Sequence, residues 1–445
     1  MTRNALLVCF VLYASAVGAQ PAPIRLSLAD AIARGLENSH RIAEAKAREA
    51  GAKAAVTTAG LAKKPIVGAN AGYARTNHVE EFSFPRPDGT RLVVYPDIPD
   101  NVISRLSFQW PIFTSGRTDA LERAAAAEAE AAGVDVETAR ADLRLEITRA
   151  YWAAVTAREA ERVLEESQVR AEAQLKDARQ RFDVGLIPPN EVSSLDAQRS
   201  RERSQLIEAS NVRESALIDL RRLIGADPEA ILELTDSIDP GASGALSALG
   251  ASGAQELIKE AMASRTERKA LSLRLGGAEE RQKAALTANK PSVAFTGGLD
   301  YANPNPKIFP RKDEWRESWD VGVSVNWNFV DFGRGRAQAA EAAALVMATR
   351  ERIAEFDTIV SADVRQRLLD LDSSQAMVRA ASDAVRAAAD ARRVITDRFN
   401  AGVATSTDVL VAQVALLENE LARTRALAGV RLAEARLQRS LGREQ

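Results

Sequence analysis

The sequence predicts a mainly α-helical fold with a membrane β-barrel portion, built from two tandem repeats of long antiparallel helices plus a β-hairpin. Three observations support this prediction. The chain has 445 residues, only 5% of them aromatic, and it is rich in Ala, Glu and Arg, which is typical of long helices. Its two halves align with each other. Four short segments alternate between apolar and polar residues, as strands do.

Composition excludes several classes of function. The formal charge is −2, and no cluster of basic residues suits a nucleic acid. Neither His40 nor His78 has a second candidate ligand nearby in sequence, so we expect no metal site. The chain carries no serine-nucleophile elbow, no phosphate-binding loop and no zinc signature. We therefore expect no enzyme, no catalytic residues and no cofactor.

Residues 1–19 are predicted to be a signal peptide. Arg3 supplies the positive charge, an apolar run follows, and small residues precede a cleavage site after Ala19. Cleavage would remove Cys9, the only cysteine, so the mature chain would form no disulfide. An uncleaved anchor is less favoured, because ~15 apolar residues fall short of the ~20 that span a bilayer. No later apolar run approaches this length, so a membrane portion would have to be a closed barrel.

The rest of the chain is predicted to be a tandem repeat. A shift of 217 residues aligns these segments without a gap: Trp110 with Trp327, Arg181–Gly185 with Arg398–Gly402, and Gly225 with Gly442. Upstream, Pro65 aligns with Pro291 at a shift of 226, so the hairpin loop is shorter in the second copy. We expect four regions after the signal peptide: a first repeat over 20–225, a linker over 226–252, a second repeat over 253–442 and a tail over 443–445.

Each copy is predicted to contain a helix, two strands, a very long helix, a tight turn and a last helix. In the first copy these elements are expected at about 27–63, 66–74, 102–113, 116–183 and 188–225. In the second copy they are expected at about 253–289, 292–301, 319–330, 333–400 and 405–442.

The long helices carry a heptad pattern. Small or apolar residues recur every seven positions at Val136, Leu143, Ala150, Ala157, Leu164, Ala171 and Ala178. A helix of ~68 residues is ~100 Å long, while the shorter helices of ~37 to 40 residues reach ~55 to 60 Å. Two short helices laid end to end thus match the length of one long helix. We expect the last helix of one copy to stack on the first helix of another. A plain soluble coiled coil shows the same periodicity.

The four strands are each apolar on one face. Val321, Val323 and Val325 alternate with glycine, serine and asparagine, and the other segments follow the same period. Aromatic residues suited to membrane interfaces stand near the strand ends, namely Tyr73, Trp110, Phe113, Trp327 and Phe332. A soluble half-buried sheet would alternate in the same way. Because transmembrane barrels need about eight strands or more, four strands would have to be pooled with those of other copies.

These features together resemble the outer-membrane efflux protein family typified by TolC. The resemblance rests on the duplicated helix and hairpin, the segments Trp110–Arg117 and Trp327–Arg334, and the paired turns, and it spans residues from about 26 to 442. One departure is Ser39, which follows Asn38 where the family often has proline.

The resemblance implies a function and partners. It implies a homotrimer whose twelve strands form one barrel in outer-membrane lipid, continuous with a helical tunnel through the periplasm. The protein would be the passive exit duct of a tripartite efflux or type I secretion system. It would dock to a periplasmic adaptor (membrane fusion) protein and serve an inner-membrane pump of the RND or ABC type. Nothing in the sequence names the exported substrate.

The two tight turns supply the candidate functional residues. They are Phe182, Gly185 and Glu191 in the first copy and Phe399, Gly402 and Asp408 in the second. The glycines are expected to end helices at positive φ, which is a sufficient structural role by itself. Thr407 is expected to cap the last helix with Asp408 in its first turn. The resemblance places these turns at the periplasmic tip of the tunnel.

Two functional roles are open for the tip. Three copies of Asp408 would form a ring that favours cations, with Glu191 at the matching position of the first copy. Phe182 and Phe399 would form a hydrophobic constriction, although packing inside the helical pairs explains them equally well.

The remaining segments are connections. The loops over 75–101 and 302–318 would face outside and restrict the outer mouth of the channel, and the linker would wrap the middle of the tunnel.

A periplasmic adaptor is the main alternative function, and a coiled-coil scaffold is the second. An adaptor would have one helical hairpin with soluble β modules, and a scaffold would not need four alternating strands.

Overall fold

The computed structural model describes residues 23–239 and 251–443. The predicted signal peptide and the centre of the predicted linker, residues 240–250, lie outside the described residues. Helices dominate, and their bounds are α1 Leu28–Asn38, α2 His40–Leu61, α3 Arg117–Asp183, α4 Pro189–Ile224, α5 Ala251–Ser264, α6 Thr266–Ala285, α7 Arg334–Asn400 and α8 Ser406–Leu441. The strands are β1 Ile24–Leu26, β2 Ile66–Arg75, β3 Phe82–Pro85, β4 Arg91–Tyr95, β5 Asp100–Phe113, β6 Leu232–Leu234, β7 Ser292–Asn303 and β8 Arg316–Asn326.

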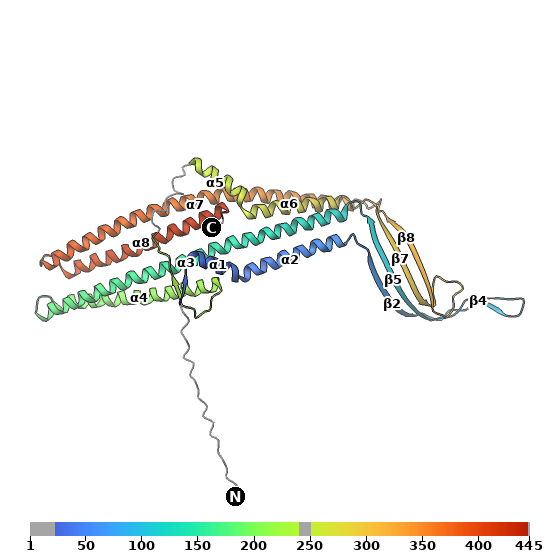
Figure 1. Cartoon of the computed structure of the whole chain (residues 1–445), viewed down its shortest axis with the longest axis horizontal. Coiled ribbons are helices and arrows are strands. Elements are labelled where there is room, and N and C mark those ends of the chain that lie inside the picture. The colour runs from blue at the N-terminus through green and yellow to red at the C-terminus, as the bar shows by residue number, and fades with distance from the viewer. Residues whose placement is uncertain (1–22, 240–250, 444–445) are drawn as a thin grey trace, which may run out of the picture. The chain divides into compact units, whose positions relative to one another are not determined.

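The chain forms two compact units, and each predicted repeat contributes to both. Of the described residues, one unit contains 23–39, 143–239 and 369–437, and the other contains 40–142, 251–368 and 438–443. The helices α3 and α7 have 67 residues each, so each passes from one unit into the other. In the first unit α3 pairs with α4 and α7 pairs with α8, each pair joined by a short turn (Figure 1).

The heptad seam predicted on α3 is buried. Six of its seven positions are at most 7% exposed, and Ala150 is half-buried. Around Leu164 the seam meets Leu206 of α4 and Leu417 of α8, so three helices share one apolar cluster. Small residues along the seam allow this close approach.

A four-stranded antiparallel sheet lies in the second unit, in the order β2-β5-β7-β8 (Figure 1). Both repeats contribute two neighbouring strands, as the sequence predicted. The register aligns Val67 with Phe108, Trp110 with Phe295, and Phe295 with Val323. Opposite residues share a face, so the apolar positions of all four strands form one apolar surface. The edge strands β2 and β8 have no further partner in the part of the chain that the structure describes.

The apolar face of this sheet is exposed in the single chain. Val321, Val323 and Val325 of β8 are 61–64% exposed, and Val67 and Leu299 are exposed as well. The opposite face carries glycine, serine, threonine and charged residues. An apolar surface of this size in a soluble monomer would mark a binding or membrane surface.

Two predicted helices, at about 27–63 and 253–289, are each interrupted by one extended residue. Ser39 separates α1 from α2 with ψ 121°, and Arg265 separates α5 from α6 with ψ 120°. Each break meets the end of the last helix of the same copy, since Gly225 contacts Asn38 and Gly442 contacts the Ser264 backbone. The stacking of last and first helices between different copies is therefore wrong. The breaks were missed because neither site contains proline or glycine.

Two small strand pairs were not predicted. β1 pairs in parallel with β6, and both lie in the first unit. The hydroxyl of Tyr151 donates to Leu26 O (3.0 Å) and to the Asp236 carboxylate (2.7 Å), and Arg158 donates to the Asp236 carbonyl (3.1 Å). Burial raises the pKa of Tyr151. Pairs of three residues are too short to produce a periodic sequence signal.

The loop expected over 75–101 contains the second unpredicted pair, the hairpin β3–β4, which turns at Gly89 with φ +80°.

The last strand also differs from the prediction, because β8 ends at Asn326 instead of about 330. Asn326 pairs with Ser292, the first residue of β7. Pro291 precedes Ser292 and has no N–H to continue the ladder, so β8 ends here.

Candidate functional site

The first candidate turn joins α3 to α4. Gly185 adopts φ +76°, and its N–H donates to Phe182 O at 2.8 Å. Leu186 N–H donates to Arg181 O at 2.9 Å, which completes the glycine-ended helix that the sequence predicts. Pro188 occupies the cap position of α4 and offers no side-chain hydrogen bond. The Glu191 carboxylate is half-buried and has no hydrogen-bond partner among the described residues.

The second turn joins α7 to α8 with the same backbone. Gly402 adopts φ +75° and its N–H donates to Phe399 O at 3.0 Å. The cap of α8 is Thr405, because its hydroxyl accepts from Asp408 N–H (3.2 Å) and the Asp408 carboxylate accepts from Thr405 N–H (2.9 Å) and hydroxyl (2.8 Å). The prediction that Thr407 is the cap is therefore wrong by two residues. These bonds form a capping box.

Hydrogen bonds from Thr405 also set the charge state of Asp408. The backbone N–H and the hydroxyl of Thr405 hold the pKa of this exposed carboxyl below its usual value. Asp408 therefore stays ionised at neutral pH, at the N-terminus of α8 where a negative charge is favoured.

Arg181 connects the two turns. Its guanidinium lies 4.8 Å from the centre of the Phe399 ring, and its Nη2 donates to Asn400 Oδ1 at 3.3 Å. Phe399 is half-buried beneath this cation, whereas Phe182 is 42% exposed and has no ring partner among the described residues. The two predicted constriction residues are thus in different environments. A role for Arg181 was not predicted, because contact between separate turns leaves no local pattern in the sequence.

The predicted interface aromatics are all exposed, and both tryptophans are positioned in the same way. Trp110 Nε1 donates to Lys63 O at 3.1 Å, and Trp327 Nε1 donates to Asn289 O at 3.0 Å. Phe113 and Phe332 are exposed at the same end of the strands, where the helices begin. Tyr73 lies toward the opposite end and donates to Asp100 at 2.7 Å. Each indole or phenol group thus exposes an apolar ring while its N–H or O–H donates a hydrogen bond.

The two aromatic levels are separated by a membrane-like distance. Register places Trp110 level with the residue before Ile66, eight strand positions from Tyr73. Positions 65 to 73 are nine residues, which lies within the ~9 to 11 residues that a tilted transmembrane strand needs.

The polar face of the sheet holds a charge cluster that the sequence analysis missed. Arg105 donates to both carboxylate oxygens of Asp300 at 3.0 Å and to Asp320 at 3.2 Å. Lys307, in the loop after β7, also pairs with both carboxylates. The signal was available, since Arg105 and Asp300 are charged residues at polar positions of two alternating strands.

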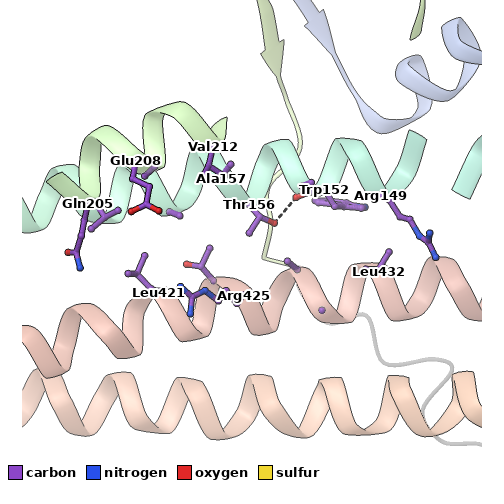
Figure 2. A pocket seen from close by; sticks show the side chains of 17 residues that line it. Arg149, Trp152, Thr156, Ala157, Gln205, Glu208, Val212, Leu421, Arg425 and Leu432 are labelled. Carbon is purple, nitrogen blue, oxygen red and sulfur yellow. Dashed lines mark hydrogen bonds between the residues drawn. The ribbon is translucent and has the colours of Figure 1, made fainter. Parts of the chain in front are cut away.

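A groove of about 730 Å³ lies in the first unit between α3, α4 and α8 (Figure 2). Thr156 and Arg149 of α3, Glu208 of α4 and Arg425 of α8 are among its lining residues. On α3 the lining residues lie about half a turn away from Tyr151 and Arg158, which contact the strand pair β1–β6. The groove and this strand pair therefore occupy opposite faces of α3.

Two candidate features are absent from the described residues. Across 23–239 and 251–443, no helix is both long and apolar enough to cross a membrane. The same residues contain no group of three His, Cys, Asp or Glu side chains that is placed to hold a metal ion.

Several solved structures share this fold. Outer membrane protein VceC from Vibrio cholerae matches with a TM-score of 0.76 at 21% identity, covering 93% of this chain and 96% of that one. The MtrE outer membrane channel of Neisseria gonorrhoeae, in its open state, matches with a TM-score of 0.75 at 18% identity, covering 94% and 89%. The CmeC outer membrane channel of Campylobacter jejuni matches with a TM-score of 0.73 at 16% identity, covering 93% and 85%. These likenesses confirm the predicted fold class.

Family membership follows from a separate comparison. The family model described as outer membrane efflux protein matches residues 31–226 and 257–443. No curated protein matches the chain. Because the two matched segments cover well over half of the sequence, and lie one in each predicted repeat, the chain belongs to the outer membrane efflux protein family.

Proposed function

We propose that this chain is the outer-membrane exit duct of a tripartite efflux or type I secretion system. The observation that carries the proposal is the four-stranded sheet, which is apolar and exposed on one face, polar on the other, and attached to long helical pairs. A lipid-facing apolar surface and a water-facing polar surface are what a barrel wall requires. The duct conducts passively and performs no catalysis, in keeping with its family.

The proposed assembly is a homotrimer. The edges β2 and β8 each present unpaired backbone groups, which lipid does not satisfy. Joining β8 of one protomer to β2 of the next removes every edge, and three copies pool twelve strands in one barrel. The aromatic residues Tyr73, Trp110, Phe113, Trp327 and Phe332 then lie at the two membrane interfaces.

The helical part is proposed to be a periplasmic tunnel. Its outer face carries the β1–β6 pair, so the groove on the opposite face of α3 lines the interior. The mature chain begins after residue 19, and two repeats over 20–225 and 253–442 flank a linker that wraps the tunnel. A periplasmic adaptor docks to the helices and connects the duct to an inner-membrane pump of the RND or ABC type.

The two turns are proposed to form the periplasmic tip. Gly185 and Gly402 allow the sharp reversals, and Phe182 and Phe399 narrow the opening. Asp408 and Glu191 supply rings of negative charge, which favour cations at an entrance. Arg181 holds the two turns of one protomer together through the contact with Phe399.

Planar bilayers test this function directly. Protein purified from outer membranes in mild detergent should insert and produce discrete conductance steps of one size. A periplasmic adaptor or a coiled-coil scaffold, the alternative functions, would produce no steps and would be released from membranes without detergent. Either result would overturn the proposal.

A further inference from the structure

The polar face of the sheet is covered by a loop of its own chain. The loop over 304–315 connects β7 to β8, and its Lys307 forms ion pairs with Asp300 (2.8 Å) and Asp320. Register places Asp300 opposite Arg105, and Asp320 opposite Gly298, so both carboxylates belong to the polar face. The loop therefore bends over the face that carries charge and leaves the apolar face free.

The contact beneath the loop is built from buried groups. Asp300 is 1% exposed, and its carboxylate accepts from Arg105 as well as from Lys307. Arg105 bridges to Asp320, so two cations and two carboxylates neutralise each other in one network. The network lies directly over Gly298, where an added Cβ would clash with the Arg105 guanidinium and push it out of place. Charged hydrogen bonds in such a network are strong because each charge keeps several partners.

Two further anchors hold the same loop. Asn305 is 3% exposed, and its amide nitrogen donates to Arg316 O and Ser318 Oγ, both at 2.9 Å. Farther along, Arg311 donates to Tyr95 OH at 2.9 Å and to Asn101 Oδ1 at 3.0 Å. The loop is thus fixed to strands contributed by both repeats.

We propose that the loop over 304–315 is a fixed constriction inside the outer mouth of the channel, and that Lys307 is the residue that pins it. This inference rests on the proposed function, because a closed barrel turns the polar face of the sheet toward the pore. Three loops then project into one lumen. The pore width and its charge at this level depend on Lys307, Asp300 and Asp320.

A pair of matched lysine variants tests the proposal. Lys307→Met breaks the pin and leaves two carboxylates with one arginine, so single-channel conductance should rise several-fold and permeability should shift toward cations. Lys312→Met removes the same charge from the same loop, but Lys312 has no side-chain partner among the described residues. It should leave conductance within about 20% of the parent value, because Lys312 takes no part in the ion-pair network that Lys307 forms with Asp300 and Asp320.

The outcomes separate the inference from the function on which it rests. Equal conductance changes in the two variants would mean that loop charge alone acts, and would overturn the pin. An unchanged Lys307→Met channel would overturn it as well. If the parent protein forms no channel at all, the proposed function fails first. Thermal stability of the trimer controls for misfolding, and a Lys307→Arg variant, which keeps the ion pairs, should restore the parent conductance.

Discussion

The two copies of the repeat share one way of ending their last helix and differ at the turn that begins it. Gly225 and Gly442 have φ values of +64° and +70°, and each lies against the helix break of its own copy. Trp110 and Trp327 likewise donate to equivalent carbonyls, those of Lys63 and Asn289. The copies thus agree at the ends of their last helices and in these tryptophan contacts.

The tip turns differ although their glycines match. The second turn has a capping box between Thr405 and Asp408, while the first has Pro188 and Glu191 at the equivalent positions, and no described residue bonds the Glu191 carboxylate. Arg181 extends from the first turn to Phe399 of the second, and Arg398, its counterpart, has no such ring contact among the described residues. Duplication has therefore kept the scaffold and left the tip free to diverge.

The largest stability effect is expected at the helix-end glycines. Gly225→Ala and Gly442→Ala should each destabilise the protein by about 2–3 kcal/mol, because left-handed backbone and crowding both oppose the added Cβ. At Gly442 the Cβ would lie 2.9 Å from the Ser264 carbonyl carbon, which is backbone and moves little. Loss of helical circular dichroism on heating measures the effect.

Gly51→Ala is the matched control, because Gly51 lies within α2 and an added Cβ meets nothing within 4 Å. This variant should be neutral or more stable by up to ~1 kcal/mol. Equal stability of all three variants would contradict the claim that the helix ends are shared scaffold contacts.

The link between the turns should affect conductance. Arg181→Gln removes the contact with Phe399, so the tip should loosen and single-channel conductance should rise several-fold. Arg179→Gln removes an equal charge two residues away in the same helix and, among the described residues, breaks only the ion pair with Asp196. If both variants conduct alike, Arg181 does not hold the tip.

The capping box should contribute a smaller and pH-dependent stability. Thr405→Ala should cost about 1 kcal/mol per protomer, as N-cap substitutions do. Thr407→Ala, at the neighbouring exposed threonine, should cost nearly nothing, and a larger loss there would contradict the observed cap.

The sign of the pH dependence follows from the lowered pKa of Asp408. The ionised carboxylate stabilises the fold fully above its unfolded pKa, near the usual 3.8, and this contribution is lost as pH falls through the lower folded value. Melting curves of the parent protein and of Thr405→Ala should converge in that acidic range. A difference that grows on acidification would refute this assignment.

The smallest effects are expected from the acids themselves. Glu191→Gln removes a charge without breaking a bond, so it should lower cation permeability modestly and leave stability unchanged. Asp408→Asn should lower both the cation permeability and the stability of the protein, because the Asp408 carboxylate also caps α8. Reversal potentials in a salt gradient measure the permeability. If neither variant shifts the reversal potential, the acidic rings have no role in selectivity.

Periodic and repeated features could be predicted from the sequence because they recur along the chain. The heptads predicted the long helices, and the apolar–polar alternation predicted the four long strands. The shift of 217 residues revealed the repeat on which the family resemblance rests. The helix breaks at Ser39 and Arg265 could not be predicted, since neither site contains proline or glycine and the helix ends that they meet, at Gly225 and Gly442, are distant in sequence. The cap of α8 is a local feature, since Thr405 and Asp408 stand three residues apart as a capping box requires, and it could have been predicted.

The candidate site was predicted less completely than the fold. Turn glycines and interface aromatics have local signals, and the structure places all of them at turns or strand ends. Contacts between distant segments have no such signal, which is why Arg181 and Lys307 were missed. Once strand register is known, the pairing of Arg105 with Asp300 follows directly.

The mass of the complex tests the central claim most directly. Protein extracted from outer membranes in mild detergent should have a mass of three times the mature chain, and heating should reduce it to one chain. This result would support a barrel that pools four strands from each of three protomers. A water-soluble monomer of one chain mass would contradict the barrel, because its exposed apolar sheet face would then have no lipid to cover it.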